Sequence, residues 1–334
     1  MVAGLLHVVV MGMWNLDFAC RRDAGKLVFM GSVADRAYSG EADFMAVRQF
    51  LIDSYAAFGE MFNWGHERWE IVRFSGNAAC ELADDRPWER FVRIWESDGR
   101  IVGVAHPESG GDLFVEIHPD YRYLEDKMFA WAEQNRSPAR RPDTPFSTWV
   151  TDGDSVRESV LEKRGWTRIG LDGHMRRRPM RAPLPNGPVV DGYIVRSLNL
   201  TTEEDSEGRA AVSRSVFGNK RTGELMKVLA WAPGYRPDLD LAAISADGTF
   251  AAYTTAWWDE VNRYVIFEPV GTHEEHRRRG LASAVIAEGL RRALALGAET
   301  AYVGSGAGSP ANHLYESLGF TEVVDDVRWD APAP

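Results

Sequence analysis

Residues 277–282 read Arg-Arg-Arg-Gly-Leu-Ala and have the composition of a phosphate-binding turn. They lie between an extended apolar run, 264–272, and a strongly helical one, 281–296. The first N–H groups of a helix have no partners within it, and the helix dipole favours an anion at that end. Gly280 lets an oxyanion approach the backbone, and arginine supplies forked donors that suit phosphate. The stretch therefore predicts a site for a phosphorylated cofactor.

Two common phosphate-binding motifs are excluded by the surrounding residues. No Gly-x-x-x-x-Gly-Lys-Ser/Thr string occurs, and the turn carries one glycine where a dinucleotide fingerprint needs three. What remains is Arg-x-x-Gly-x-Ala after a strand. It is followed further along the chain by a second pattern, Asn312-x-x-Tyr315-x-x-x-Gly319-Phe320.

This pair of motifs resembles the coenzyme A motif and the following helix of the GNAT N-acetyltransferase superfamily, and the resemblance covers residues 191–330. It implies acetyl-CoA as co-substrate, with the pantetheine arm along one strand and the diphosphate at the helix start. Ala282 departs from the common pattern, where a second glycine is frequent, and alanine is also tolerated there. The residues that the resemblance places against the cofactor are Val270, Gly271, Thr272, Arg277, Arg278, Arg279, Gly280, Leu281, Ala282, Ser283 and Asn312.

Acetyl transfer to an amine also needs a base for the ammonium proton and an acid for the departing thiolate. Glu268 precedes the motif on the same strand, where similar enzymes often carry the base. Tyr315 occupies the tyrosine position of the second motif, and a phenol is a suitable proton donor to a thiolate. The competing interpretations are an exposed strand glutamate and a core tyrosine whose hydroxyl is satisfied.

The two halves of the chain repeat one pattern. Tyr38 and Tyr193 begin the halves, and the same offset aligns Ile117-His118-Pro119 with Thr272-His273-Glu274. The first half lacks the predicted anion-binding turn and base, because Glu125 stands at the position of Gly280 and Leu113 at that of Glu268. Leu161 and Glu158 stand at the positions of Tyr315 and Asn312. A carboxylate repels a diphosphate, so the first copy is predicted to be non-catalytic, a scaffold with a possible role as one wall of the acceptor pocket. For its aromatic segment 62–69, core packing is favoured over a place in that pocket.

The alternation of helical and extended patterns predicts an α/β fold of two tandem GNAT-type domains. Each is expected to be a mixed, mostly antiparallel sheet with helices on both faces. The expected boundaries are an N-terminal extension (1–36), a degenerate GNAT-like domain (37–178), a proline-rich linker (179–190) and a catalytic GNAT domain (191–334).

Composition narrows the partners. The formal charge of −11 argues against nucleic acid and against an anionic membrane surface, and it suits a cationic substrate. Two cysteines make no disulfide framework, so a cytoplasmic location is expected. His273-Glu-Glu-His276 is not the His-Glu-x-x-His motif, and no metal is predicted. The sequence does not determine the oligomeric state.

The sequence thus predicts an N-acetyltransferase that moves an acetyl group from acetyl-CoA to a primary amine of a small, cationic molecule. The amine attacks directly in a ternary complex. Two alternatives remain open: a protein or peptide N-acetyltransferase, and a non-catalytic regulator that binds acetyl-CoA.

Overall fold

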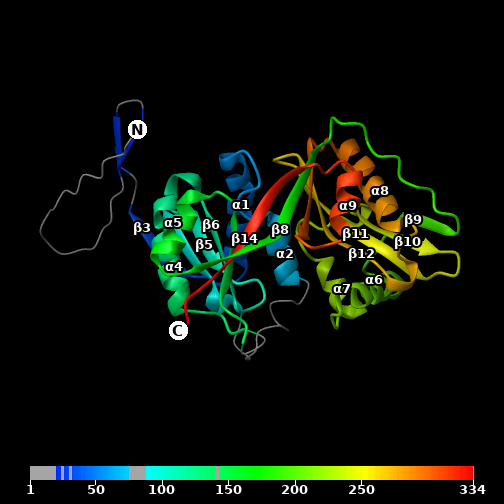
Figure 1. Cartoon of the computed structure of the whole chain (residues 1–334), viewed down its shortest axis with the longest axis horizontal. Helices are drawn as coiled ribbons and strands as arrows, with labels where there is room; N and C mark the ends of the chain where they lie inside the picture. Colours follow the sequence, from blue (N-terminus) through cyan, green and yellow to red (C-terminus); the bar gives the residue numbers. More distant parts are fainter. Residues whose placement is uncertain (1–19, 24–25, 30–31, 75–87, 140–142, 334) are drawn as a thin grey trace, which may run out of the picture.

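The computed structural model describes residues 20–23, 26–29, 32–74, 88–139 and 143–333. A small hairpin of β1 (Cys20–Asp23) and β2 (Lys26–Phe29) lies apart from the main body (Figure 1). The other described strands form one twelve-stranded mixed sheet that runs through both halves of the chain. The α/β architecture predicted from the sequence is confirmed, whereas the continuity of the sheet was not anticipated.

The first half supplies six of these strands in sequence order, if β8 is counted with it. The first of them begins at Val33, so the last residues of the segment predicted as an extension belong to the sheet. The elements are β3 (Val33–Ala37), α1 (Gly40–Phe58), α2 (His66–Phe74), the 3₁₀ helix η1 (Trp88–Phe91), β4 (Arg93–Ser97), β5 (Arg100–His106), β6 (Asp112–Ile117), the 3₁₀ helix η2 (Pro119–Leu124), α4 (Glu125–Gln134), β7 (Ser147–Thr151), α5 (Ser155–Lys163) and β8 (Thr167–Pro179).

The second half follows the same order of elements, with boundaries close to those expected from the sequence. Its elements are β9 (Tyr193–Ser197), α6 (Glu203–Phe217), α7 (Gly223–Leu229), the 3₁₀ helix η3 (Pro237–Leu239), β10 (Asp240–Ser245), β11 (Phe250–Asp259), β12 (Tyr264–Thr272), the 3₁₀ helix η4 (Glu274–His276), α8 (Leu281–Leu296), β13 (Thr300–Gly306), α9 (Ala311–Ser317) and β14 (Glu322–Asp330).

The two halves exchange their last strands. The strand order is β3-β4-β5-β6-β7-β14-β8-β13-β12-β11-β10-β9, so β14 lies beside β7 of the first half and β8 beside β13 of the second. The exchanged strands pair with each other, from Glu322 opposite Arg177 to Asp330 opposite Thr167 (Figure 1). Val327 and Trp329 of β14 are consequently buried in the core of the first half. Each half is completed by a strand of the other.

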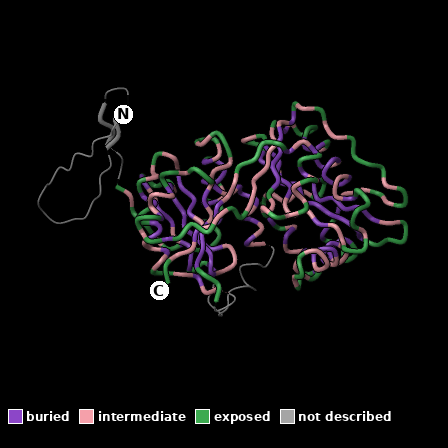
Figure 2. The backbone as a smooth tube through the Cα atoms, in the orientation of Figure 1, coloured by how far each residue is buried: buried purple, intermediate pink, exposed green. Residues whose placement is uncertain are grey.

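Helices cover both faces of the second half because side chains alternate along its strands. Leu241 and Ala243 of β10 face Leu281 and Val285 of α8, whereas the intervening Ala242 packs with residues of α6 and α7. Buried residues accordingly fill the interior between sheet and helices (Figure 2). This arrangement is the one expected of a GNAT-type domain.

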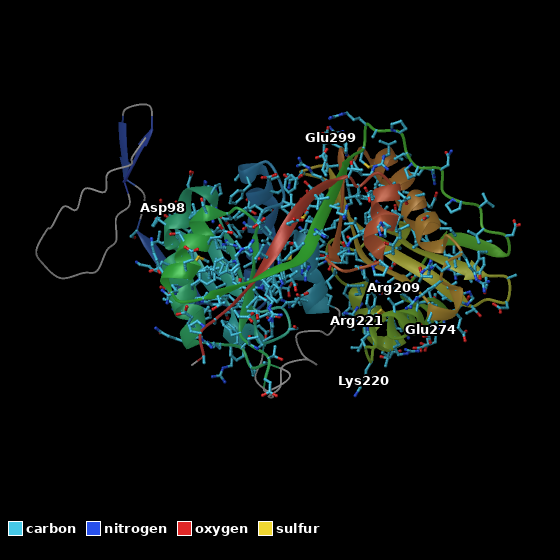
Figure 3. All side chains as sticks on the ribbon, viewed as in Figure 1. Asp98, Arg209, Lys220, Arg221, Glu274 and Glu299 are labelled. Carbon is cyan, nitrogen blue, oxygen red and sulfur yellow. The ribbon has the colours of Figure 1, made fainter. Side chains whose placement is uncertain are left out.

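A buried ion pair fixes α6 to the sheet. Arg209, labelled in Figure 3, lies with its Nε 3.4 Å from Asp240 Oδ1, and its Nη2 donates to Thr255 Oγ1 at 2.8 Å. Both charged side chains are almost fully buried, so each needs the other to offset the loss of hydration. The pair ties α6 to β10 and β11 on the face opposite α8.

The segment predicted as a linker runs against α8. Its first residue, Pro179, ends β8, and Leu184 packs against the hydrophobic cluster beneath α8. A Cβ placed on Gly187 would lie 2.9 Å from the Cβ of Ala287, so the chain passes close to the helix. Among the described residues, none of the helices combines the length and the apolar character needed to span a bilayer.

Candidate active site

The predicted cofactor strand separates from its neighbour at one end of the second half. β12 pairs with β13 in parallel from Tyr264 opposite Thr300 to Ile266 opposite Tyr302. Beyond this point β12 remains paired with β11, as far as Thr272 opposite Ala252. β13 meanwhile continues along β8 to Gly306. The two strands therefore open a gap whose edge carries Val270 and Gly271, the place predicted for the pantetheine arm.

The start of α8 offers unpaired donors to an anion. Gly280 is its N-terminal cap, with φ of 81°, and no side chain caps this end. Arg278 also has a positive φ, 63°, which is uncommon outside glycine and costs of order 1 kcal/mol. The turn from Arg277 to Gly280 is exposed. A glycine at the cap, exposed arginines and an open helix N-terminus together fit a diphosphate.

A cavity of about 1190 Å³ joins this turn to both halves of the chain. Most of the residues predicted to bind the cofactor line it. They are Val270, Gly271, Thr272, Arg277, Arg278, Gly280, Leu281, Ala282 and Ser283, together with Glu268 and Tyr315.

Two residues predicted to bind the cofactor lie outside the cavity. The Nη1 of Arg279 donates to the Tyr193 hydroxyl at 3.0 Å, on the outer side of the turn. The Nδ2 of Asn312 donates to the carbonyl oxygens of Gly306 at 3.1 Å and Ala307 at 3.0 Å. Asn312 thus holds the loop between β13 and α9. The role predicted for each side chain at the cofactor stays a prediction.

Glu268 faces a guanidinium from the other half of the chain. Its Oε1 lies 3.6 Å from Nη1 of Arg68 in α2, and the Nη2 of Arg68 donates to Glu108 Oε2 at 2.8 Å. The Glu268 side chain keeps 31% of its surface exposed. Burial raises the pKa of Glu268, the charge of Arg68 opposes that rise, and Glu108 adds to it. The result is a carboxylate that is a stronger base than a solvated one.

Tyr315 presents its hydroxyl to the same space. The residue is buried at 5% relative exposure, beside Phe320 and above the cluster beneath α9. Burial, together with the nearby charge of Glu268, raises the pKa of Tyr315 to about 12. A phenol that holds its proton this firmly is a donor rather than an anion at neutral pH.

Residues of the first half form the opposite wall of the cavity, and among them are residues of the segment 62–69, for which the sequence favoured core packing. Trp69 and His66 are buried as expected, but the rest of this aromatic segment faces the cavity. The wall also carries Glu67, whose Oε2 accepts from the Tyr264 hydroxyl at 3.3 Å. The signal available in the sequence was the density of aromatic and charged residues in 62–69. The lining residues from this segment are Phe62, Asn63, Trp64, Gly65, Glu67 and Arg68.

At the equivalent place in the first half, a carboxylate and two arginines form a closed network. Glu125 begins α4 and is completely buried, with its Oε1 2.6 Å from Nε of Arg122 and its Oε2 3.1 Å from Nε of Arg157. Arg122 also pairs with Asp154 at 2.7 Å. The position corresponding to the diphosphate turn is therefore occupied by the protein's own anion.

Side chains also satisfy the backbone along the separated strand of the first half. β6 pairs with β7 only from Asp112 opposite Ser147 to Leu113 opposite Thr148. Past that point Nη2 of Arg157 donates to the Val115 carbonyl at 2.9 Å. Val115 corresponds to Val270 by the repeat offset. The first half keeps the separated strands, and Arg157 bonds to a backbone carbonyl equivalent to one in the predicted pantetheine site.

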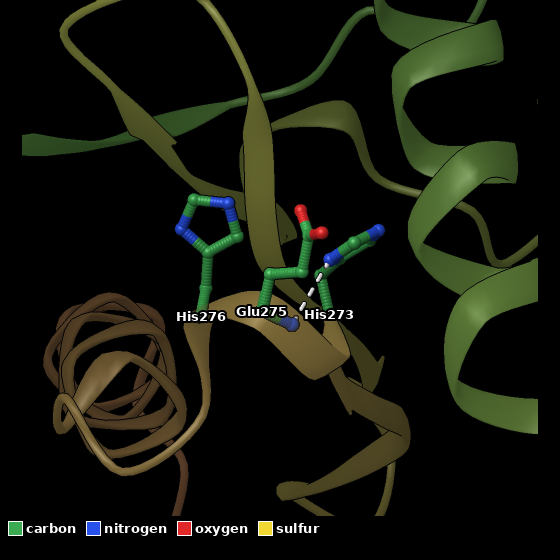
Figure 4. Close-up of side chains that lie close together, drawn as sticks. All are labelled: His273, Glu275 and His276. Carbon is green, nitrogen blue, oxygen red and sulfur yellow. Dashed lines mark hydrogen bonds between the residues drawn. The ribbon is translucent and has the colours of Figure 1, made fainter.

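Three possible metal ligands lie together just before the predicted phosphate-binding turn. The donor atoms of His273, Glu275 and His276 are all within 4.8 Å of one another (Figure 4). His273 Nδ1 accepts from the Glu275 backbone N–H at 3.4 Å, and His276 Nδ1 lies 2.8 Å from the Tyr193 hydroxyl. The sequence singled out His273 and His276 but predicted no metal, because their spacing is not that of His-Glu-x-x-His; the structure brings the Glu275 carboxylate close to both. The expectation of no metal stays a prediction.

Comparison with known proteins agrees with this geometry. The sequence profile of the Acetyltransferase (GNAT) family matches residues 213–320. The mycothiol acetyltransferase of Thermomonospora curvata is 28% identical over 253 residues, which are 71% of this chain and 81% of that protein.

Two solved structures share the fold over most of the chain. A GCN5-related N-acetyltransferase from Sphaerobacter thermophilus superposes with a TM-score of 0.58 at 17% identity, covering 90% of this chain and 97% of the other. A tandem GNAT protein from the clavulanic acid biosynthesis pathway gives a TM-score of 0.59 at 15% identity, covering 91% and 100%. At these identities the likeness concerns the fold.

The family match covers part of the second half, and the fold of the chain as a whole is similar to that of a tandem GNAT protein. The family match over residues 213–320 and the acetyltransferase relative identify an N-acetyltransferase.

Proposed function

We propose that the second half binds acetyl-CoA and transfers its acetyl group to a primary amine of a small cationic molecule that is held against the first half. The observation that carries this proposal is the single cavity that contains the phosphate-binding turn, Glu268, Tyr315 and the first-half wall. Acetyl-CoA supplies an activated acetyl thioester. With only two cysteines in the chain, we place the reaction in the cytoplasm.

The chain's own residues supply the proton transfers. The carboxylate of Glu268 takes a proton from the acceptor ammonium, directly or through one water, so that the amine nitrogen becomes nucleophilic. The N–C bond forms as the C–S bond breaks, and the Tyr315 hydroxyl donates its proton to the departing sulfur. The raised pKa of both groups suits these directions, since Glu268 becomes a better base and Tyr315 stays protonated.

The acceptor side of the cavity favours a cation. Glu67, Glu108 and Glu268 line it, and Arg68 is the cation that lies among them. Trp64 and Phe114 add aromatic faces, and the guanidinium of Arg68 already lies 4.9 Å from the Trp64 ring centroid. Aromatic rings and carboxylates together stabilise a positively charged group more than either does alone.

The alternatives of a peptide acetyltransferase and of a non-catalytic regulator predict different behaviour. A regulator needs neither Glu268 nor Tyr315 in the cofactor cavity, and both are there. A peptide acceptor would need a groove for an extended backbone, whereas the wall opposite Glu268 is built of charged and aromatic side chains. The relative's name points to a small acceptor as well, and a mycothiol-type acceptor belongs among the first compounds to assay.

The test is release of free CoA from acetyl-CoA in the presence of a panel of amines, with the full chain. We expect turnover of small cationic amines, a fall in kcat of about 100-fold in Glu268→Gln, and a fall of about 10- to 100-fold in Tyr315→Phe. Acetyl-CoA affinity should change less than threefold in both variants. Full turnover in both would contradict the proposed roles, and tight acetyl-CoA binding without turnover of any amine would favour the regulator.

A further inference from the structure

The exchanged strands form the floor of the cavity between the two halves. Thr151 of β7 lies opposite Asp326 of β14, Asp326 opposite Gly173 of β8, and Gly173 opposite Gly306 of β13. All four residues line the cavity. Neighbouring strands are about 4.8 Å apart, so this row spans roughly 14 Å. The cavity is thus long enough for an acceptor that extends well beyond its reacting nitrogen.

Two neighbouring members of this row are glycines, and one member carries a charged side chain. Gly173 and Gly306 have no side chains, so their backbone forms the cavity surface at these positions. Asp326 is the only member of the row with a charged side chain. Among the described parts of the chain, no side chain forms an ion pair or a hydrogen bond with its carboxylate. Burial raises the pKa of Asp326, as expected for a carboxylate without a paired cation.

The charged groups around Asp326 leave negative charge in excess. Arg68 in α2 acts on it from above, but this guanidinium is also shared with Glu108 and Glu268. His174 of β8 acts on it as well, and the Nδ1 of His174 is paired with Asp325 at 2.7 Å. Asp172 and Asp325 add further negative charge. A cationic group over the floor would therefore be attracted to Asp326.

We propose that Asp326 binds a second cationic group of the acceptor, so that the preferred substrate is an elongated amine with two positive charges. One nitrogen lies at Glu268 and reacts, while the other lies over the exchanged strands at Asp326. Asp326 comes from the last strand of the chain, next to the first half, and it therefore selects the acceptor across the strand exchange. This inference rests on the proposed function, because it assigns the acceptor of the same site.

The probes are α,ω-diamines from 1,4-diaminobutane to 1,8-diaminooctane, each compared with the n-alkylamine of the same length. At the best length we expect kcat/KM for the diamine to exceed that for the monoamine by about tenfold, the size of one partly buried charge pair. Asp326→Asn should reduce this ratio to twofold or less. Asp325→Asn is the matched control: it removes the same charge from the next residue, which is paired with His174 and does not line the cavity, so the ratio should fall much less than in Asp326→Asn.

Calorimetric titration of each amine in the presence of CoA separates this inference from the proposed function. A diamine preference in binding that is lost in Asp326→Asn supports the inference even if no amine is acetylated, a result that would refute the proposed function alone. Equal efficiency and equal affinity for diamines and monoamines in the wild-type chain would overturn it. The inference would also be overturned if Asp326→Asn lowered kcat/KM and affinity for diamines and for monoamines to the same extent.

Discussion

The helices α8 and α4 begin at equivalent places in the two halves and differ in what their first turn can accept. α8 begins after Gly280 with no capping side chain and with exposed arginines before it. α4 begins with Glu125, completely buried between Arg122 and Arg157. One start is open to an external anion, and the other already holds an internal one. The two halves thus share one fold, but only the start of α8, in the second half, is accessible to an external anion.

The difference also explains how the first half is used. Its separated strands remain, but Arg157 and Asn63 bond to the backbone that corresponds to the pantetheine site. The side of the first half that faces the second supplies Arg68 and Glu67 to the shared cavity. In our account the first half therefore does not bind the cofactor and instead shapes the acceptor site.

The largest expected effect comes from giving α8 the charge that α4 has. Gly280→Asp places a carboxylate at the open helix start, at a φ of 81°, and its Cβ would lie 3.3 Å from Pro188 Cγ. We expect acetyl-CoA affinity to fall by about 100-fold or more, from charge repulsion and from backbone strain. Gly280→Ala, with the strain alone, should lose less. Calorimetry measures both, and an unchanged Kd for Gly280→Asp would contradict the placement of the diphosphate.

The reciprocal change opens the network in the first half. Arg157→Met removes one cation from buried Glu125 and the donor to the Val115 carbonyl. Breaking a buried pair on one side costs about 3 kcal/mol, which urea unfolding should detect. Affinity for acetyl-CoA should stay within twofold, because α8 is untouched. A loss of acetyl-CoA binding would show that the halves are not independent at this step.

The third effect is on the pH dependence of stability, and it depends on Glu67, a buried carboxyl group of the first half that lines the cavity. Burial raises the pKa of Glu67 to about 7 from a usual 4.5. The folded state therefore holds this proton more firmly than the unfolded state, so the group favours folding at low pH. That contribution is lost as pH rises from about 4.5 through 7.

Glu67→Gln cannot titrate, so its free energy of unfolding should fall less between pH 5 and pH 8 than that of the wild type. The difference should be at most about 3 kcal/mol and smaller if the site relaxes. Urea unfolding at both pH values checks this. Parallel pH dependence in the two proteins would mean that Glu67 is not held in its protonated form.

The smallest expected effect tests whether the first half tunes the base. The charge of Arg68 lowers the pKa of Glu268 against the rise caused by burial. In Arg68→Met that pKa should rise further, moving the acid limb of the pH profile of kcat/KM to higher pH and reducing activity severalfold at pH 6. Arg68→Lys should restore part of the profile. A loss of kcat/KM that is the same at every pH would indicate a structural role only.

Local features of the second half could be predicted because they depend on nearby residues. The apolar stripe of 281–296 and Gly297 define a helix and its end, and α8 has these bounds, with Gly297 at a φ of 93°. The basic turn and the apolar run before it predicted the strand, turn and helix that form the cofactor end of the cavity. The carboxylate at the start of α4 could likewise be read from the repeat offset, whereas its pairing with Arg122 and Arg157 could not.

The strand exchange could not be predicted, because the repeat makes both pairings compatible with the sequence. β8 and β14 occupy equivalent positions, so either could complete either half. The exchange depends on contacts between residues far apart in the chain, such as Val327 and Trp329 in the core of the first half. The roles proposed for Arg68 and Asp326 were not anticipated for the same reason, since only the assembled halves bring these residues together.

The most direct test of the central claim is the stoichiometry of acetyl-CoA binding to the full-length chain by isothermal titration calorimetry. The account predicts one site per chain, which Gly280→Asp abolishes and Arg157→Met leaves in place. Two sites per chain would contradict the closed state of the first half, and no binding would contradict the assignment of the cavity to acetyl-CoA.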